Sequence, residues 1–237
     1  MKPMYHENQS RGLADHGWLK SRHTFSFADY YNPESMDFGL LRVLNDDIVT
    51  PSMGFGTHPH ENMEIISIPL SGALRHQDSM GNKHIISTGE VQIMSAGSGI
   101  THSEYNDSSS EDVNFLQIWV LPKERDITPR YDQKLFDEGN RKNRFQLLVA
   151  PENSEETVLI NQDAWFSLAD IEAEKQVVYE KNDKKNGVYF FVIEGNVNID
   201  GNAVKRRDGL GIVDGKTYPI VAQSKAQILA IEVPLVD

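Results

Sequence analysis

The sequence predicts an all-β protein with two domains. Short apolar or alternating runs, separated by Gly, Asn and Asp, recur from Thr24 to Val120 and again from residue 145 onward. Such runs are typical of strands joined by tight turns, and segments with helical periodicity are scarce. A chain of 237 residues is long enough for two domains that each bury a core. We therefore expect two sandwiches or barrels.

The first domain is expected to span residues 1–134. Its strand-like runs are FSFA, FGLLRVL, MEIISIPL, GALRHQ, HIIS, EVQIMSA and NFLQIWVL. From Pro122 to Arg144 the chain becomes charged and polar, with few large apolar residues. This composition predicts a connection that lies over the surface, with room for one helical turn.

The second domain is expected to span residues 135–237. Its strand-like runs are TVLI, WFSL, QVVYE, GVYFFVIEGNVNID, GLGIV, YPIVA and AQILAIEV. A strand, a Gly-Asn turn and a later Gly-led strand follow one another in both halves, which favours an internal duplication. All eight histidines lie in the first 102 residues. The second domain therefore has no imidazole to offer a metal.

Composition excludes several classes of function. Lys and Arg total 23 against 35 for Asp and Glu, so the net charge is −12, and no basic run interrupts the acidic balance. Such a surface repels phosphate backbones and anionic lipid, so we expect no direct nucleic-acid or membrane binding. The absence of cysteine excludes disulfides and thiolate sites. No apolar stretch suits a signal peptide or a membrane span, so we expect a cytoplasmic protein.

Two segments carry residues that could bind a metal: GFGTHPHENMEI (54–65) and SAGSGITHSEYN (95–106). In a strand, side chains at i and i+2 share a face, so His58 and His60 can point inward together, as can His102 and Glu104. A lone His-x-His is weak evidence for a metal site, because histidines often make ordinary hydrogen bonds in turns. The His-x-Glu about 40 residues later supplies the complementary half of a site. Four such ligands on an octahedral metal leave two positions open for chemistry.

These two segments resemble the two cupin motifs. The longer text ADHGWLKSRHTFSFADYYNP, LRVLNDD, HQDSMGN and ITPRYDQ resembles the pirin family, specifically its bacterial quercetin 2,3-dioxygenase-like branch. The resemblance implies a bicupin, that is, two jelly-roll-like β-barrel cupin domains. It also implies that His58, His60, His102 and Glu104 hold one divalent transition metal per chain. Fe(II) is expected, with Mn, Ni, Co, Cu and Zn as alternatives.

Three further residues, Phe55, Met63 and Glu64, are candidates for a substrate pocket beside the metal. In many other cupins the carboxylate of the first motif, here Glu64, is a ligand, whereas the pirin pattern leaves it out. We expect a supporting or structural role for Glu64, with ligation as the alternative. Phe55 and Met63 neighbour the ligands and are candidates for a substrate pocket, although apolar residues in strands usually form core.

The other histidines receive less specific interpretations. His76 precedes a Gly-Asn turn, so a surface or hairpin hydrogen-bonding role is favoured over lining of a pocket. His23 is expected to pack within the N-terminal segment. His6, His16 and His84 are expected to face solvent or to lie in turns.

The resemblance implies a dioxygenase that opens the central ring of a flavonol with O2 and releases carbon monoxide. Glu104 is the candidate base, and Glu64 is the alternative. A different class of function stays open: a non-catalytic, metal- or redox-sensing regulatory protein that binds a protein partner. A third reading is an oxygenase of another small phenol. Flavonol turnover would separate these hypotheses.

Overall fold

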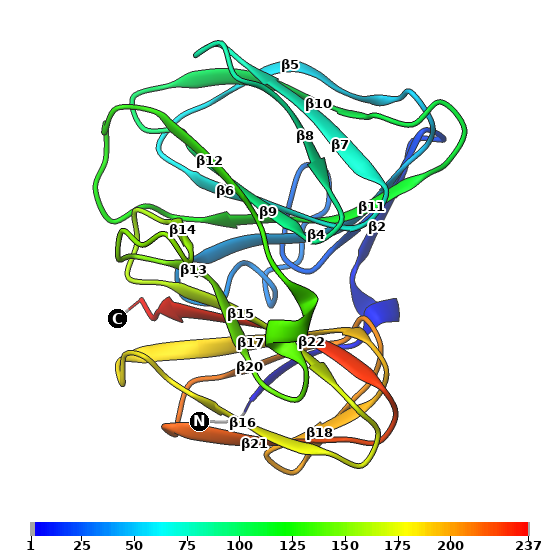
Figure 1. The fold of residues 1–237 in the computed structure, drawn as a ribbon, viewed down its shortest axis with the longest axis vertical. Helices are drawn as coiled ribbons and strands as arrows, with labels where there is room; N and C mark the ends of the chain where they lie inside the picture. Colours follow the sequence, from blue (N-terminus) through cyan, green and yellow to red (C-terminus); the bar gives the residue numbers. More distant parts are fainter. Residues whose placement is uncertain (1–2, 237) are drawn as a thin grey trace.

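The computed structural model describes residues 3–236, which form strands joined by turns and two short 3-10 helices. Figure 1 shows two barrels stacked along the long axis of the molecule. Each barrel pairs a seven-stranded sheet with a four-stranded sheet. The all-β fold expected from the sequence is therefore confirmed. Within residues 3–236, no helix is long and apolar enough to cross a membrane.

The first barrel is built from the N-terminal half of the chain. Its strands are β2 (Gly12–Asp15), β3 (Leu19–His23), β4 (Leu41–Val49), β5 (Gly54–His60), β6 (Glu64–Ser71), β7 (Ala73–Asp78), β8 (Lys83–Ser87), β9 (Glu90–Ser95), β10 (Ile100–Asn106), β11 (Val113–Val120) and β12 (Arg130–Leu135). The large sheet has the order β12-β9-β6-β11-β4-β3-β2, and the small sheet has the order β5-β10-β7-β8.

The second barrel repeats this plan. Its strands are β13 (Gln146–Ala150), β14 (Val158–Leu159), β15 (Trp165–Ile171), β16 (Gln176–Glu180), β17 (Asn186–Glu194), β18 (Val197–Ile199), β19 (Asn202–Val204), β20 (Gly209–Ile212), β21 (Thr217–Ala222) and β22 (Ala226–Pro234), with β1 (Met4–His6) from the N-terminus. The large sheet has the order β1-β20-β17-β22-β15-β13-β14, and the small sheet has the order β16-β21-β18-β19.

The chain crosses between the barrels twice, once between β1 and β2 and once between β12 and β13. β1 pairs antiparallel with β20, so residues 4–6 lie in the sheet of the second barrel and not in the first domain, where the sequence placed them. The 3-10 helix η1 (Asn8–Ser10) follows β1. The division expected between residues 134 and 135 otherwise remains a prediction.

The polar segment 122–144 contains more regular structure than its composition suggested. β12 pairs with β9 at the edge of the first barrel, and the 3-10 helix η2 (Glu138–Arg141) supplies the expected helical turn. Most residues of β12 are only half-buried, which explains why a polar sequence can form this strand. Edge strands with polar side chains also resist pairing with other chains.

The two large sheets face each other, and the most extensive apolar cluster fills the space between them. Its members include Ile66, Ile68, Leu116, Ile118 and Val120 from the first barrel and Phe166, Tyr189, Phe191, Leu229 and Ile231 from the second. Because side chains alternate along a strand, the intervening residues of β6 and β11 face the inside of the first barrel. Ser67, Gln117 and Trp119 are among these inward residues.

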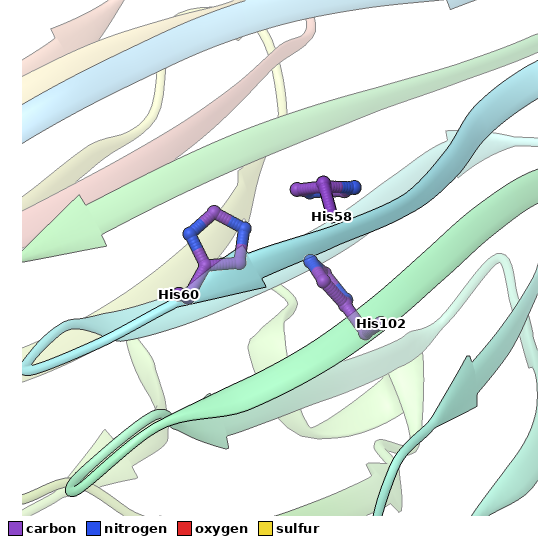
Figure 2. A group of neighbouring side chains, drawn as sticks. All are labelled: His58, His60 and His102. Carbon is purple, nitrogen blue, oxygen red and sulfur yellow. The ribbon is translucent and has the colours of Figure 1, made fainter.

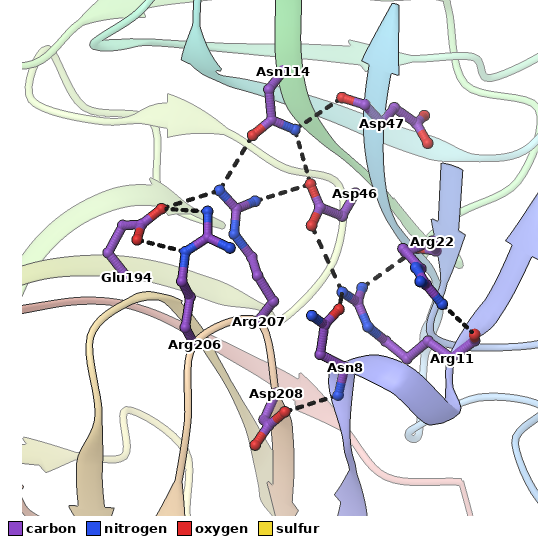
Figure 3. A network of polar contacts seen from close by, with 10 residues as sticks. All are labelled: Asn8, Arg11, Arg22, Asp46, Asp47, Asn114, Glu194, Arg206, Arg207 and Asp208. Carbon is purple, nitrogen blue, oxygen red and sulfur yellow. Dashed lines mark hydrogen bonds and ion pairs between the residues drawn. The ribbon is translucent and has the colours of Figure 1, made fainter. Parts of the chain in front are cut away.

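A charged network lies at the same interface (Figure 3). Nη1 of Arg207 donates to Asp46 of β4 at 2.9 Å, and Nη2 of Arg11 lies 3.6 Å from the second oxygen of that carboxylate. Arg207 also donates to Glu194, at the end of β17, at 3.3 Å. The side chains of Arg11, Asp46 and Arg207 are nearly buried. The network therefore ties β4 of the first barrel to the second barrel through charge-assisted hydrogen bonds.

Candidate metal centre and aromatic pocket

Three histidines meet at the small sheet of the first barrel, and Figure 2 shows their rings converging from two strands. His58 and His60 are two residues apart in β5, so they share one side of that strand. β10 pairs with β5 and places His102 directly opposite His58. The two strands can approach closely because residue 54 is glycine. A Cβ at this position would collide with the carbonyl oxygen of Glu104. The local strand pairing thus produces the cluster.

The three rings are close enough to share one ion. Ring centroids lie 4.7 Å apart for His58 and His60, 4.5 Å for His58 and His102, and 4.9 Å for His60 and His102. One ligand nitrogen from each ring lies within 4.8 Å of the other two. His102 is buried, whereas His58 and His60 are half-buried. The cluster is therefore closed on the barrel side and reachable from the β5 side.

Two of the three imidazoles, those of His60 and His102, have the protonation state that metal binding requires. Burial, reinforced by the neighbouring histidines, lowers the pKa of His60 to about 4 and that of His102 to about 3. Both rings are consequently uncharged at neutral pH. Nδ1 of His58 lies 2.8 Å from the carbonyl oxygen of Gly56 and must donate its proton there. This contact leaves the lone pair of Nε2 available, as in many metal-binding histidines.

This donor set fits a divalent transition metal. Within the described residues, both ring nitrogens of His102 are buried without a hydrogen-bond partner. A buried polar atom left in that state costs about 1–3 kcal/mol, so a ligand that accepts the lone pair is favoured. Imidazole nitrogen suits Fe, Ni, Cu and Zn, and three protein ligands leave positions for other groups.

Glu104 lies on the same strand and is held by two inward-facing residues. The hydroxyl of Ser67 lies 3.0 Å from Oε1, and Nε2 of Gln117 donates to Oε2 at 2.7 Å. A carboxylate oxygen of Glu104 lies within 4.8 Å of ligand nitrogens on His102 and His76. Glu104 therefore adjoins the three-histidine cluster through His102, and its role as a fourth ligand stays a prediction.

Glu64 points away from the histidines. Its Oε2 accepts hydrogen bonds from the hydroxyl of Ser95 at 2.7 Å and from the backbone N–H of Asn161, in the second half, at 3.1 Å. Glu64 is four residues after His60, an even spacing that would place both side chains on one face of a continuous strand, but the chain turns between β5 and β6, where Asn62 has a φ of 51°. Burial raises the pKa of Glu64. Glu64 thus makes its hydrogen bonds at the domain interface, and its place in a substrate pocket stays a prediction.

His76 was expected to have a surface or hairpin hydrogen-bonding role; it is fully buried in the first barrel, where its Nε2 lies 3.4 Å from Oδ2 of Asp78. Its ring centroid lies 5.3 Å from that of His102, and β7 places it opposite Glu104 on β10. The signal in the sequence is the alternation along β7, in which Leu74, His76 and Asp78 are all buried. A charged residue and a histidine at inward positions indicate a polar interior.

The remaining histidines divide into buried and exposed residues. His6 was expected in solvent, but Nδ1 lies 2.8 Å from the hydroxyl of Tyr189, a residue 183 positions away that no local pattern could identify. His23 is buried among aromatic rings of the N-terminal segment. His16 and His84 are exposed.

An aromatic pocket of about 600 Å³ opens near the cluster, although none of the three histidines lines it. It lies where β5, at the edge of the small sheet, approaches β2, at the edge of the large sheet. Its ring-bearing lining residues are His16, Trp18, His23, Phe27, Tyr30 and Phe55. The ring of Phe27 lies 5.3 Å from that of Trp119, which lies 4.9 Å from that of His60. Trp119 therefore bridges the pocket wall and the histidines.

The two apolar candidates for the substrate pocket, Phe55 and Met63, lie in different surroundings. Phe55 lines the aromatic pocket. Met63 packs against a small apolar cluster that includes Ile65 and Met94, and it does not line this pocket. A larger hollow of about 740 Å³ runs past Lys134 and Thr157, but no histidine lines it. The volume and aromatic lining of the pocket beside β5 suit a small planar ligand.

Two family models match the chain. One is described as Pirin and covers residues 6–120, and the other is described as Quercetinase C-terminal cupin domain and covers residues 147–233. A quercetin 2,3-dioxygenase of Escherichia coli (strain K12) is 46% identical over 228 residues, which are 94% of this chain and 95% of that protein. A pirin-like protein of Caulobacter vibrioides is 40% identical over 222 residues, with 93% and 95% covered.

Solved structures agree with these matches. The crystal structure of YhhW from Escherichia coli has a TM-score of 0.94 at 43% identity and covers 99% of each chain. The structure of bacterial pirin YhhW in complex with nickel(II) has a TM-score of 0.93 at 42% identity, with 99% and 100% covered. A quercetin 2,3-dioxygenase from Acinetobacter baumannii, at 17% identity and a TM-score of 0.77, shares the fold.

Proposed function

Because this chain belongs to the pirin family and both of its barrels are cupin domains, we propose that its first barrel is the catalytic domain of a metal-dependent dioxygenase that cleaves a flavonol. The observation that carries the proposal is the three-histidine cluster, together with an aromatic pocket that Trp119 links to it. The names of the relatives support this substrate class. The same donor set would serve Fe(II), Mn, Ni, Co, Cu or Zn.

His58, His60 and His102 would hold the metal, with Glu104 as the proposed fourth ligand. A bound divalent metal supplies Lewis acidity, which lowers the pKa of a phenolic hydroxyl. Glu104 would accept the proton of that hydroxyl, because a carboxylate oxygen of Glu104 lies within 4.8 Å of a ligand nitrogen of His102. Ser67 and Gln117 would fix the orientation of the carboxylate through their hydrogen bonds. Glu64 accepts hydrogen bonds from Ser95 and Asn161 on the other side of the sheet, which favours Glu104 over Glu64 for this role.

The flanking residues would bind and orient the substrate. Trp18, Phe27 and Phe55 supply aromatic faces and edges along the pocket, and rings of this kind favour stacked or edge-on contacts with a planar ligand. Their apolar surfaces would also exclude water from the reacting hydroxyl. The protein would thus contribute orientation of the substrate, electrostatic stabilisation and exclusion of water.

The test is turnover after metal loading. Protein purified without added metal is loaded separately with Fe(II), Mn(II), Ni(II), Co(II) or Cu(II), and quercetin absorbance and headspace carbon monoxide are followed. We expect quercetin loss with equimolar carbon monoxide for at least one metal. Metal-loaded protein that turns over no flavonol would contradict the proposal. That result would favour the regulatory alternative or, if another phenol is consumed, a different substrate.

Two buried carboxylates provide a matched pair of variants. Glu104→Gln should lower kcat by roughly 100-fold or more, because general base catalysis typically contributes that much. Glu64→Gln should keep kcat within about twofold of the wild type, since its partners are at the domain interface. Equal losses in both variants would contradict the assignment of Glu104 as the base.

A further inference from the structure

One buried polar side chain, that of His23, borders the aromatic pocket. Among the lining residues that the structure describes, Leu19 and His23 are buried, and the others are half-buried or exposed. His23 is 4% exposed, and its Nδ1 is buried without a hydrogen-bond partner among the described residues. The pocket therefore combines aromatic walls with a buried polar group whose hydrogen-bonding capacity is unused.

The position of His23 follows from strand pairing. His23 is the last residue of β3, which lies between β2 and β4 in the large sheet. Asn45 of β4 stands directly opposite His23, but Oδ1 of Asn45 is also buried without a partner among the described residues. This neighbour therefore leaves the imidazole unpaired. A buried polar group in that state is destabilising, so a ligand that forms the missing hydrogen bond would be favoured.

Two aromatic rings hold the imidazole in place. The centroid of the His23 ring lies 5.2 Å from that of Phe27 and 6.3 Å from that of Tyr30. Phe27 and Tyr30 are the ends of a tight turn, in which the backbone N–H of each donates to the carbonyl oxygen of the other at 3.0 Å. Residue 12 is glycine, and a Cβ there would collide with the ring of Tyr30. The wall around His23 is therefore preorganised, which favours ligand binding.

The imidazole of His23 is uncharged at neutral pH. Burial, with smaller effects from His16 and Arg11, lowers the pKa of His23 to about 4. A neutral imidazole has one N–H donor and one nitrogen that accepts. A hydroxyl can also donate and accept, so it matches either nitrogen. A charged group on the ligand would instead lose its hydration against a wall of aromatic rings.

We propose that His23 recognises a hydroxyl group of the planar aromatic ligand in this pocket and so determines the preference for hydroxylated ligands. The aromatic rings can stack on any planar ligand, whereas the imidazole forms a hydrogen bond that an unsubstituted ring cannot form. This hydroxyl differs from the reacting one, because no histidine of the metal cluster lines the pocket. The proposal rests on the proposed function, which makes this pocket the substrate site.

Ligand binding to metal-free protein provides the test, measured by quenching of tryptophan fluorescence, since Trp18 lines the pocket. The wild type should bind quercetin about tenfold more tightly than 3-hydroxyflavone, which lacks every hydroxyl except the reacting one. His23→Phe keeps a ring but removes both nitrogens, so the preference should fall to about twofold or less. His23→Gln keeps a donor and an acceptor and should retain most of the preference. His84→Phe, at an exposed position of β8, is the control and should behave like the wild type.

Equal affinity of the wild type for the two flavonols would overturn the proposal. A folded His23→Phe protein that keeps the full preference would also overturn it. If circular dichroism shows that His23→Phe does not fold, wild-type protein with isotope-labelled histidine decides by nuclear magnetic resonance. Quercetin should shift the imidazole signals that are missing from His23→Gln, and unchanged signals overturn the proposal. None of these measurements needs turnover, so selective binding without turnover would contradict the proposed function alone.

Discussion

The two barrels share an architecture but have opposite interiors. The second barrel is filled by apolar side chains, among them Val188, Phe190, Val192, Tyr218 and Ile228. The first barrel presents polar side chains to its interior, including His76, Gln92, His102, Glu104 and Gln117. The same strand plan therefore supports either a packed core or a chamber for chemistry.

Hydrogen bonding shows the difference most clearly. In the second barrel the buried carboxylate of Glu232 accepts from the hydroxyl of Tyr179 at 3.0 Å and from the backbone N–H groups of Asn182 and Asp183 at 2.9 and 2.7 Å. In the first barrel, both polar atoms of the Gln92 side chain are buried without a partner among the described residues, and so are those of His102. Unpaired buried groups are destabilising. The first barrel thus keeps binding capacity at a cost in stability, and the second barrel supplies stability.

Removal of the second barrel should have the largest effect. A shortened chain of residues 11–135 retains every strand of the first barrel but exposes the apolar side chains that face the interface. We expect it to aggregate, which centrifugation and light scattering would show. The same chain with Ile66→Lys and Leu116→Lys should be more soluble. A soluble, monomeric 11–135 chain that binds metal normally would break the proposed division of roles.

A cavity in the second barrel should lower the free energy of unfolding without changing metal binding. Phe190 is fully buried there, so Phe190→Ala should lower the free energy of unfolding by about 3–5 kcal/mol. In a chain of this size the melting temperature should fall by roughly 10 °C. Val178→Ala, at an exposed position of β16, is the control and should change stability by less than about 0.5 kcal/mol. Loss of metal from folded Phe190→Ala protein would show that the barrels are not separable in this way.

Lowering the pH should reduce stability mainly through the first barrel, and this effect should be smaller than those of the two changes above. His60 and His102 have pKa values of about 4 and about 3 when folded, below the ordinary value of 6.5. Between the folded and unfolded pKa values, the unfolded chain binds more protons than the folded chain. The contribution of these two imidazoles to the stability of the metal-free protein therefore falls as the pH drops below 6.5. His60→Gln/His102→Gln should show a shallower loss of melting temperature between pH 6.5 and 4.

Another buried group titrates in the opposite sense. Burial raises the pKa of Asp47 to about 7, and this acts equally in both proteins, so their difference isolates the two imidazoles. Identical pH profiles for the wild type and the double variant would contradict the assignment.

Strand periodicity predicted the parts of the site that depend on one strand at a time. His58 and His60 share a face of β5, and the three-histidine cluster follows once β10 pairs beside it. Periodicity failed for Glu64, because a turn after His60 resets the alternation. The sequence did carry an unused signal. Ser67 and Gln117 are single polar residues inside apolar strand runs, the pattern of a polar group at a core position.

Contacts between distant segments were beyond the reach of local patterns. The burial of His6 depends on Tyr189, and the role of Glu64 depends on Asn161. Nothing near these residues in the sequence encodes the partner. Fold class and strand content could therefore be derived from short windows, whereas the crossing of β1 and the domain interface required the three-dimensional arrangement.

The pairing of β1 with β20 has a consequence for biosynthesis. Met4 lies opposite Gly211, so roughly 200 residues must be synthesised before this strand can find its partner. At a translation rate of about 5–20 residues per second, that delay is on the order of 10–40 s. The strands of the first barrel emerge during this interval and need no contribution from β1. β1 is thus made before every strand of the first barrel but can pair only after β20 has been made, and this pairing links the two barrels.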